Sequence, residues 1–209
     1  NDQAGAMASQ RRAFDFTLLF SVAVVAAFIN VPDFIMRAMF ARGAFSKADA
    51  AAAGATLAAY AIGLIPFVLI RSAVATFYAR QDTATPVKAA LTGIAVNIAL
   101  KIALVGSLAQ VGLALATAVG AWINLLLVIA FAVRAGYLEL DRALMQSMAK
   151  FAGCGIVLAG ALWSAAWFAN QQMAQWGALR DEAALLLLIV TGAAVYASSI
   201  LLLFGRGWL

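Results

Sequence analysis

The chain has 209 residues, of which 66% are hydrophobic and only 11% are charged, and its formal net charge is +5. A soluble domain carries about 25% charged residues because its surface faces water, so this composition excludes a soluble globular protein. The sequence contains no histidine, which excludes histidine-based metal sites, triads and proton relays, and its single cysteine, Cys154, excludes an intramolecular disulfide.

Long continuous apolar runs predict membrane-spanning helices. Strands of a membrane barrel would alternate apolar and polar residues over short segments, whereas these runs are rich in Ala and Leu. Backbone groups in hydrocarbon must bond internally, so helices are the remaining solution. One crossing needs about 20 apolar residues. The sequence therefore predicts an all-α integral membrane protein with about six transmembrane helices.

The first expected span covers residues 13–29. The lead-in before it, residues 1–12, is polar and does not fit a cleaved signal peptide. A short amphipathic helix is expected at residues 32–40, directly after the first span. The second span, residues 46–79, is longer than a bilayer requires, and Pro66 is expected to break or kink it.

The third span is expected to begin at Pro86, since proline suits the first turn of a helix, and to end near Leu108. A tight connection at residues 106–110 then leads into the fourth span, so these two spans form a hairpin. The last three spans are expected at residues 111–135, 144–169 and 183–204.

Basic residues near the span ends predict the orientation of the chain in the membrane. If the N-terminal segment is cytoplasmic, eight basic residues fall on the cytoplasmic side and four on the opposite side. This imbalance predicts that both termini of the segment are cytoplasmic. Two further basic residues, Arg71 and Lys101, fall inside predicted spans.

The most distinctive stretch is FYARQDTATPVK, residues 77–88, a polar turn between the second and third spans. Asp82 or Thr83 is expected to cap the third helix. One interpretation of the stretch is a well-capped hairpin on the cytoplasmic side. The other is a gate or hinge at which lobes rock during transport. The candidate gate or hinge residues are Pro66, Arg80, Asp82 and Pro86.

The same stretch resembles the MurJ (MviN) family of lipid II flippases. It is preceded by AAYAIGLIPFVLIRSAVATFYAR and followed by VGLALATAVGAWIN. The segment FARGAF, residues 40–45, is similar to the same family. These motifs stand in the family's order over roughly residues 30–130.

This resemblance implies a member of the multidrug/oligosaccharidyl-lipid/polysaccharide (MOP) exporter superfamily. Family members typically have fourteen helices in two lobes around a central cavity, and this chain would supply the last six. Residues 13–135 would form four helices of the C-terminal lobe, and residues 136–209 two additional C-terminal helices. Because residue 1 is not Met, we expect the chain to be a fragment or a processed product.

The implied activity is alternating-access movement of lipid II across the bacterial inner membrane. The implied partners are lipid II or another undecaprenyl-pyrophosphate-linked lipid, membrane lipids and the missing N-terminal lobe of the same protein, without nucleic acid. The family's basic cavity residues lie largely in the earlier helices. We therefore expect this segment to work only together with that lobe.

Arg71 is the candidate substrate-binding residue. It follows Pro66 by little more than one helical turn, and its side chain could face a cavity and bind an anionic head group. The alternative is an arginine at the cytoplasmic interface that points to lipid head groups.

Asn97, Lys101 and Thr117 form a candidate coupling site or intramembrane polar network. Lys101 lies one turn after Asn97, and Thr117 lies at a similar depth across the hairpin. The set resembles the region where some family members are thought to bind a coupling cation. The ammonium group of Lys101 would take the place of that cation. Three interpretations of Lys101 stay open: a side chain that snorkels to the interface, an interhelical ion pair, or a direct role in coupling.

Two other functions stay open: a polysaccharide or drug exporter of the same superfamily, and a non-transporting membrane scaffold. An enzyme is the weakest hypothesis, because no Ser or Asp pair stands in a recognisable catalytic setting. We predict no catalytic residue, no cofactor and no metal site.

Overall fold

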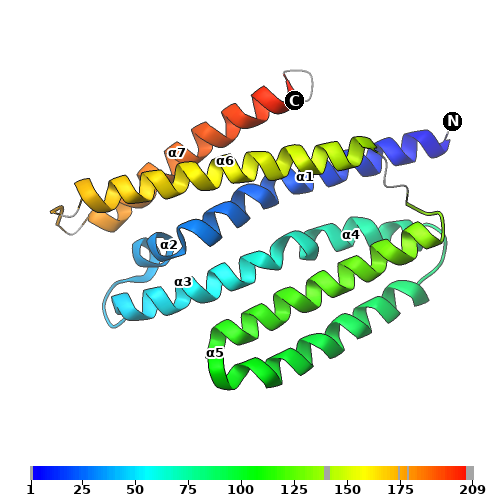
Figure 1. Ribbon diagram of the computed structural model, residues 1–209, viewed down its shortest axis with the longest axis horizontal. Coiled ribbons are helices and arrows are strands. Elements are labelled where there is room, and N and C mark those ends of the chain that lie inside the picture. The colour runs from blue at the N-terminus through cyan, green and yellow to red at the C-terminus, as the bar shows by residue number, and fades with distance from the viewer. Residues whose placement is uncertain (1, 139–141, 174, 178, 206–209) are drawn as a thin grey trace. The chain divides into compact units, whose positions relative to one another are not determined.

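The structure is a computed structural model that describes residues 2–138, 142–173, 175–177 and 179–205. Every regular element among these residues is an α-helix (Figure 1). The helices are α1 (Asp2–Asn30), α2 (Pro32–Phe40), α3 (Lys47–Ile62), α4 (Leu64–Tyr78), α5 (Ala84–Arg134), α6 (Arg142–Gln172) and α7 (Arg180–Phe204). The polar lead-in is helical from Asp2 onward and continues directly into the first span.

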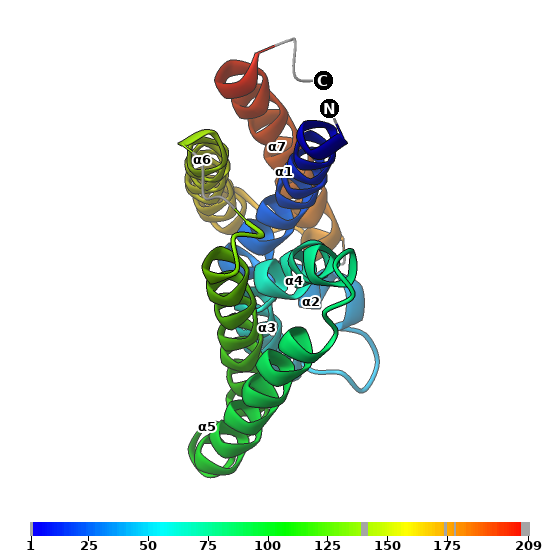
Figure 2. The ribbon, with the colours of Figure 1, turned by 90° about the vertical axis from the view of Figure 1, so that its right-hand side faces the viewer.

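The described residues contain five continuous helical stretches that are long and apolar enough to cross a membrane. The longest, α5, has 51 residues but is two helices, because Ala109 leaves the helical region with φ 47° and ψ −129°. The two arms of α5 fold back on each other (Figures 1 and 2). The predicted hairpin is therefore confirmed. With α5 counted as two helices, the five stretches supply six helices of the expected kind. We call residues 84–108 the first arm and residues 110–134 the second arm.

Small residues let the two arms of α5 approach closely. A Cβ added to Gly112 would lie 2.7 Å from the carbonyl oxygen of Leu104. One added to Gly120 would lie 2.8 Å from both the Cβ of Asn97 and the carbonyl oxygen of Gly93. Glycine is needed at these positions because lipid supplies no hydrophobic drive between helices, so their association depends on close packing.

The long second span bends, but three residues earlier than expected. α3 and α4 are separated at Gly63, whose N–H bonds to the carbonyl of Tyr60 in a tight turn. Pro66 is buried inside the first turn of α4. A proline is tolerated there because the first N–H groups of a helix need no intrahelical partner. The interruption expected from Pro66 therefore lies at Gly63, three residues before the proline, where the missing N–H of Pro66 takes effect.

The turn between α4 and α5 is closed by backbone hydrogen bonds. The N–H of Asp82 bonds to the carbonyl of Phe77 at 3.1 Å, and the N–H of Gln81 bonds to that of Tyr78 at 3.0 Å. This is a Schellman motif, which requires a left-handed residue at the position of Gln81. Gln81 indeed has φ 61°, although glutamine carries a Cβ that disfavours this region.

Gln81→Gly is expected to stabilise the protein, because glycine adopts positive φ without the cost of about 1 kcal/mol that a side chain incurs there. The measurement is the midpoint of thermal unfolding of the purified protein in detergent. Gln146→Gly in α6 is the matched control. That exposed helical position should lose up to about 1 kcal/mol on the same substitution. A lowered midpoint for Gln81→Gly would contradict the assigned turn.

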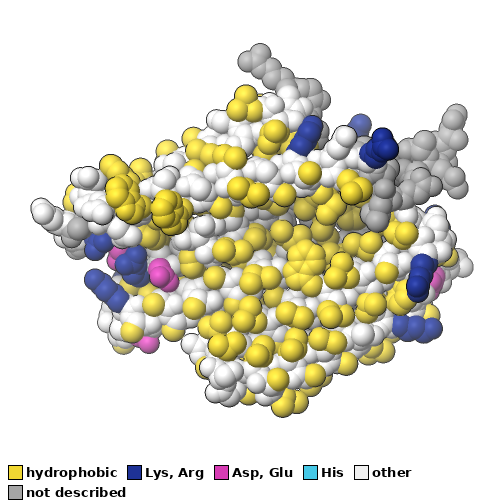
Figure 3. Space-filling view, viewed as in Figure 1, with side chains coloured by type: hydrophobic (Ala, Val, Ile, Leu, Met, Phe, Trp, Pro, Cys, Tyr) yellow, Lys and Arg dark blue, Asp and Glu magenta, His cyan; other side chains and the backbone are white. Residues whose placement is uncertain are grey.

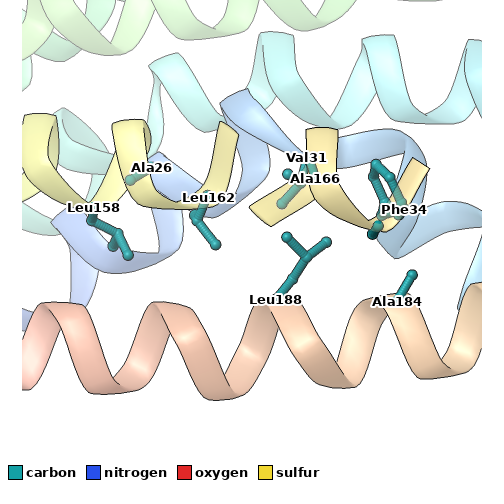
Figure 4. Packing of buried hydrophobic residues seen from close by; sticks show 9 residues of the cluster. Ala26, Val31, Phe34, Leu158, Leu162, Ala166, Ala184 and Leu188 are labelled. Carbon is teal, nitrogen blue, oxygen red and sulfur yellow. The ribbon is translucent and has the colours of Figure 1, made fainter. Parts of the chain in front are cut away.

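The chain divides into two compact units, which we describe separately: unit 1, residues 1–21 and 59–148, and unit 2, residues 22–58 and 149–209. Unit 1 is organised by the packing of α4 against α5. Unit 2 has an apolar core from α1, α2, α6 and α7, shown in Figure 4. Its members include Val31, Phe34, Leu158, Leu162 and Leu188.

Unit 2 also carries ion pairs. They join Arg37 of α2 and Arg42 of the turn after α2 to carboxylates in the first turn of α7. The guanidinium of Arg42 lies 3.0 Å from the Glu182 carboxylate, and that of Arg37 lies 4.0 Å from Asp181. Large apolar side chains are exposed along the described helices, as expected of side chains that face lipid. On the face seen in Figure 3, hydrophobic side chains cover the middle of the helices, while Lys and Arg lie near helix ends.

Candidate functional site

A cavity of about 400 Å³ lies in unit 1, between α4 and both arms of α5. We call it the Arg71 cavity. Its apolar walls come from α4 and the first arm, and its polar groups come from α4 and the second arm. The lining residues are Ile70, Arg71, Val74, Tyr78, Pro86, Val87, Ala90 and Asn124.

Arg71 supplies the charge of this cavity. Its side chain is exposed, and its guanidinium carbon lies 6.0 Å from the ring centroid of Phe67. No carboxylate among the described residues pairs with it. A guanidinium presents a planar fork of donors that suits phosphate or carboxylate, so Arg71 is free to bind an anion.

Asn124 is a polar member of the site that sequence reasoning did not single out. Its Oδ1 atom is buried and has no hydrogen-bond partner among the described residues, and the same holds for the Oδ1 atom of Asn97. A Cβ added to Gly93 would lie 2.9 Å from the Cβ of Asn124, just as Gly120 faces Asn97. Each arm of the hairpin therefore places an asparagine against a glycine of the other arm.

The signal for Asn124 was present in the sequence as a repeated pattern. The first arm contains Gly93-x-x-x-Asn97, and the second contains Gly120-x-x-x-Asn124. The first repeat is the more conspicuous of the two, because Asn97 precedes the charged Lys101 by one turn. Tyr78 belongs to the distinctive stretch at residues 77–88.

Thr117 and Lys101 lie at matching levels of the two arms of α5. Gly120 faces Asn97 and Gly112 faces Leu104, so Thr117 lies level with the turn that holds Lys101. The Thr117 hydroxyl donates to the Leu113 carbonyl of its own helix at 2.9 Å. Lys101 is half-buried and forms no ion pair with a described residue. The candidate coupling residues Asn97, Lys101 and Thr117 are not among those that line the Arg71 cavity.

The candidate gate residues have separate local roles. Pro86 is buried and lines the Arg71 cavity. The Asp82 carboxylate accepts a hydrogen bond from the N–H of Thr85 at 3.0 Å, so Asp82 rather than Thr83 caps α5. This bond holds the pKa of Asp82 below its usual value, because it stabilises the ionised carboxylate.

Arg80 connects this turn to Tyr137, which follows the second arm of α5. Its guanidinium carbon lies 4.3 Å from the ring centroid of Tyr137, and its side chain donates to the Thr76 carbonyl at 3.1 Å. The Tyr137 ring also meets the buried ring of Phe77 edge to face, with centroids 5.5 Å apart. Contacts among the side chains of Arg80, Tyr137 and Phe77 therefore hold this turn in place. The predicted orientation puts the turn on the cytoplasmic side of the membrane.

A second hollow, in unit 2, is an apolar groove of about 390 Å³. Side chains of α1, α2, α6 and α7 line it, among them Phe28, Ile35, Leu162 and Leu188. Apart from Tyr196, the lining consists of apolar side chains and glycine. It suits a hydrocarbon chain.

Comparisons with known proteins agree on one family. The model of the family described as "Lipid II flippase MurJ" matches residues 1–181. The chain is 36% identical over 156 residues to the probable lipid II flippase MurJ of Rhizobium meliloti (strain 1021), an alignment that covers 75% of this chain. It is 33% identical over 174 residues to the probable lipid II flippase MurJ of Vibrio cholerae serotype O1, covering 81% of this chain.

A solved structure shows the same fold. The chain superimposes on "Lipid II flippase MurJ, inward closed conformation" with a TM-score of 0.74 at 21% sequence identity, over 93% of this chain and 38% of that one. The matched regions are only part of the relatives: 29% of the Rhizobium protein and 32% of the Vibrio protein.

Proposed function

The chain belongs to the MurJ family of lipid II flippases, and we propose that it forms the C-terminal part of a protein that moves lipid II across a membrane by alternating access. Lipid II is the membrane-anchored precursor of peptidoglycan. On this proposal, the activity also requires an N-terminal lobe of the same protein. Transport, and no chemical conversion, is the proposed activity.

The observation that carries this proposal is the guanidinium of Arg71, which pairs with no carboxylate among the described residues and lies at the wall of a cavity between α4 and α5. A charge inside a membrane span is costly, so such an arginine indicates a ligand that supplies the negative charge. The diphosphate of lipid II is such a ligand, because a guanidinium binds phosphate oxygens in a bidentate manner. Tyr78 and Asn124 add hydrogen-bonding groups beside it.

The apolar groove of unit 2 supports a lipid substrate independently. Burying a hydrocarbon chain against its apolar lining is favourable at about 25 cal/mol per Å² of surface removed from water. In a membrane this gain is smaller, because the lipid tails compete, so the groove would guide a polyprenyl tail rather than hold it tightly.

The chain is a multi-pass membrane segment, since its apolar helices are long enough to cross a bilayer. We place it in the bacterial inner membrane, where lipid II is made available to a flippase. Both termini of the segment are proposed to face the cytoplasm, because basic residues in short loops favour that side.

Depletion of the protein that carries this segment is expected to make lipid II accumulate in the inner leaflet of the inner membrane. The measurement is the accessibility of lipid II to a reagent added from the periplasmic side. Restoring the intact protein should restore accessibility. If lipid II distribution were unchanged while a polysaccharide intermediate or a drug accumulated instead, the protein would be an exporter of another substrate. No change in any lipid-linked intermediate would favour a scaffold.

A further inference from the structure

The bend between α3 and α4 leaves one backbone carbonyl without its usual partner. In a continuous helix, the carbonyl of Ile62 would accept a hydrogen bond from the N–H of residue 66. That residue is proline, which has no N–H. In a bilayer no water replaces the lost donor, so an unpaired carbonyl at this position is costly.

Trp122 of the second arm supplies the missing donor. Its indole Nε1–H donates to the carbonyl oxygen of Ile62 at 2.9 Å. One turn earlier on the same arm, Ala118 contacts Gly63 so closely that an added Cβ on Gly63 would lie 2.7 Å from the Ala118 Cα. The bend is therefore fixed to the second arm by one hydrogen bond and one close backbone contact, both inside unit 1.

The same two elements form the Arg71 cavity further along. α4 runs from the bend to Arg71, and the second arm runs from Trp122 to Asn124, which faces the same cavity. Because α4 begins directly after Gly63, attaching this end of α4 to the second arm sets where Arg71 lies relative to Asn124. A shift of this end of α4 away from the second arm would separate the Ile62 carbonyl from Trp122 and leave it unpaired.

We propose that Trp122 is a positioning residue: by pairing the carbonyl that Pro66 leaves free, it holds the bend at Gly63 and thereby Arg71 in its place at the cavity. The inference rests on the proposed function, since Arg71 is taken to contact the substrate. It assigns a role in transport to a residue that touches neither the substrate nor the cavity.

A double-mutant cycle tests this role in the full-length protein in lipid nanodiscs. Trp122→Phe keeps an aromatic ring but removes the donor. Pro66→Ala restores a backbone N–H that can bond to Ile62 within the helix. Trp122→Phe alone is expected to raise amide hydrogen exchange several-fold in the segment around the bend. In the Pro66→Ala background the same substitution should have little effect, because the carbonyl has another donor.

The position of Arg71 is read out with a cysteine. Arg71→Cys should react with a water-soluble maleimide at a rate that Trp122→Phe changes several-fold and that Pro66→Ala restores. Trp163→Phe, at a position 67% exposed on α6, is the matched control and should alter neither readout. Neither measurement needs lipid II, so failure here is distinguishable from failure of the proposed function.

Two outcomes would overturn the proposal. Equal effects of Trp122→Phe in the Pro66 and Pro66→Ala backgrounds would mean that the ring acts only by packing. An unchanged labelling rate at position 71 would mean that the bend does not position Arg71. If both readouts behave as expected but Arg71 variants transport lipid II normally, the bend is held as proposed and the proposed substrate site is wrong.

Discussion

Gly120→Ala is expected to separate the two arms of the α5 hairpin and to destabilise the protein by about 1–3 kcal/mol, as overpacking in a close-packed interior does. The added Cβ would lie 2.8 Å from the Asn97 Cβ and from the Gly93 carbonyl oxygen. Backbone atoms cannot move aside as the end of a flexible side chain can. The arms must therefore shift, and Asn97 and Asn124 with them.

The measurement is thermal unfolding of the full-length protein in detergent. Gly106→Ala is the control on the same hairpin, because nothing lies within 4 Å of a Cβ added there. That variant should keep or slightly raise the midpoint, since alanine favours helix over glycine by up to about 1 kcal/mol. An equal response of the two variants would show that the arms are not in contact at Gly120.

Arg71→Gln is expected to lower the rate of lipid II transport by about 10- to 100-fold, the loss of one charge-assisted interaction of about 1.5–3 kcal/mol. Glutamine keeps much of the length of the side chain but removes the positive charge. The transport rate of Arg71→Lys should fall between those of the unmodified protein and Arg71→Gln, because an ammonium keeps the charge and loses the bidentate geometry.

The measurement is the initial rate of movement of labelled lipid II in proteoliposomes, with thermal unfolding to show that each variant is folded. Arg134→Gln is the control, since that exposed arginine ends the second arm and is not among the residues that line the cavity. Normal transport by Arg71→Gln would remove Arg71 from the substrate site and favour the interpretation of an interfacial arginine.

Much of the fold follows from the sequence, because lipid imposes a simple rule. Each crossing needs a helix with an apolar surface, so composition and run length predict the spans. The hairpin at residues 106–110 was predicted correctly for that reason. The interruption that Pro66 predicts lies at Gly63, three residues before the proline, because the missing N–H of Pro66 leaves the Ile62 carbonyl on that side without a partner in the helix.

The candidate site was less accessible to sequence reasoning. Arg71 stood out, since a charge inside an apolar run is rare. Asn124 did not, because no local pattern shows that it shares a cavity with Arg71, which lies 53 positions earlier in the chain. Pro86 was chosen as a helix start and is also a wall of the Arg71 cavity.

The apolar helices of this chain, the position of the hairpin at residues 106–110 and the charges inside the spans can all be read from the sequence alone. These properties depend on single residues and on the period of the pattern along the chain. Only the tertiary structure decided that Asn124 faces the Arg71 cavity and that Trp122 donates to the Ile62 carbonyl. Trp122 and Ile62 lie 60 positions apart in the chain, and Asn124 and Arg71 lie 53 apart. Their proximity depends on how α4 packs against the second arm of α5, which no local pattern encodes.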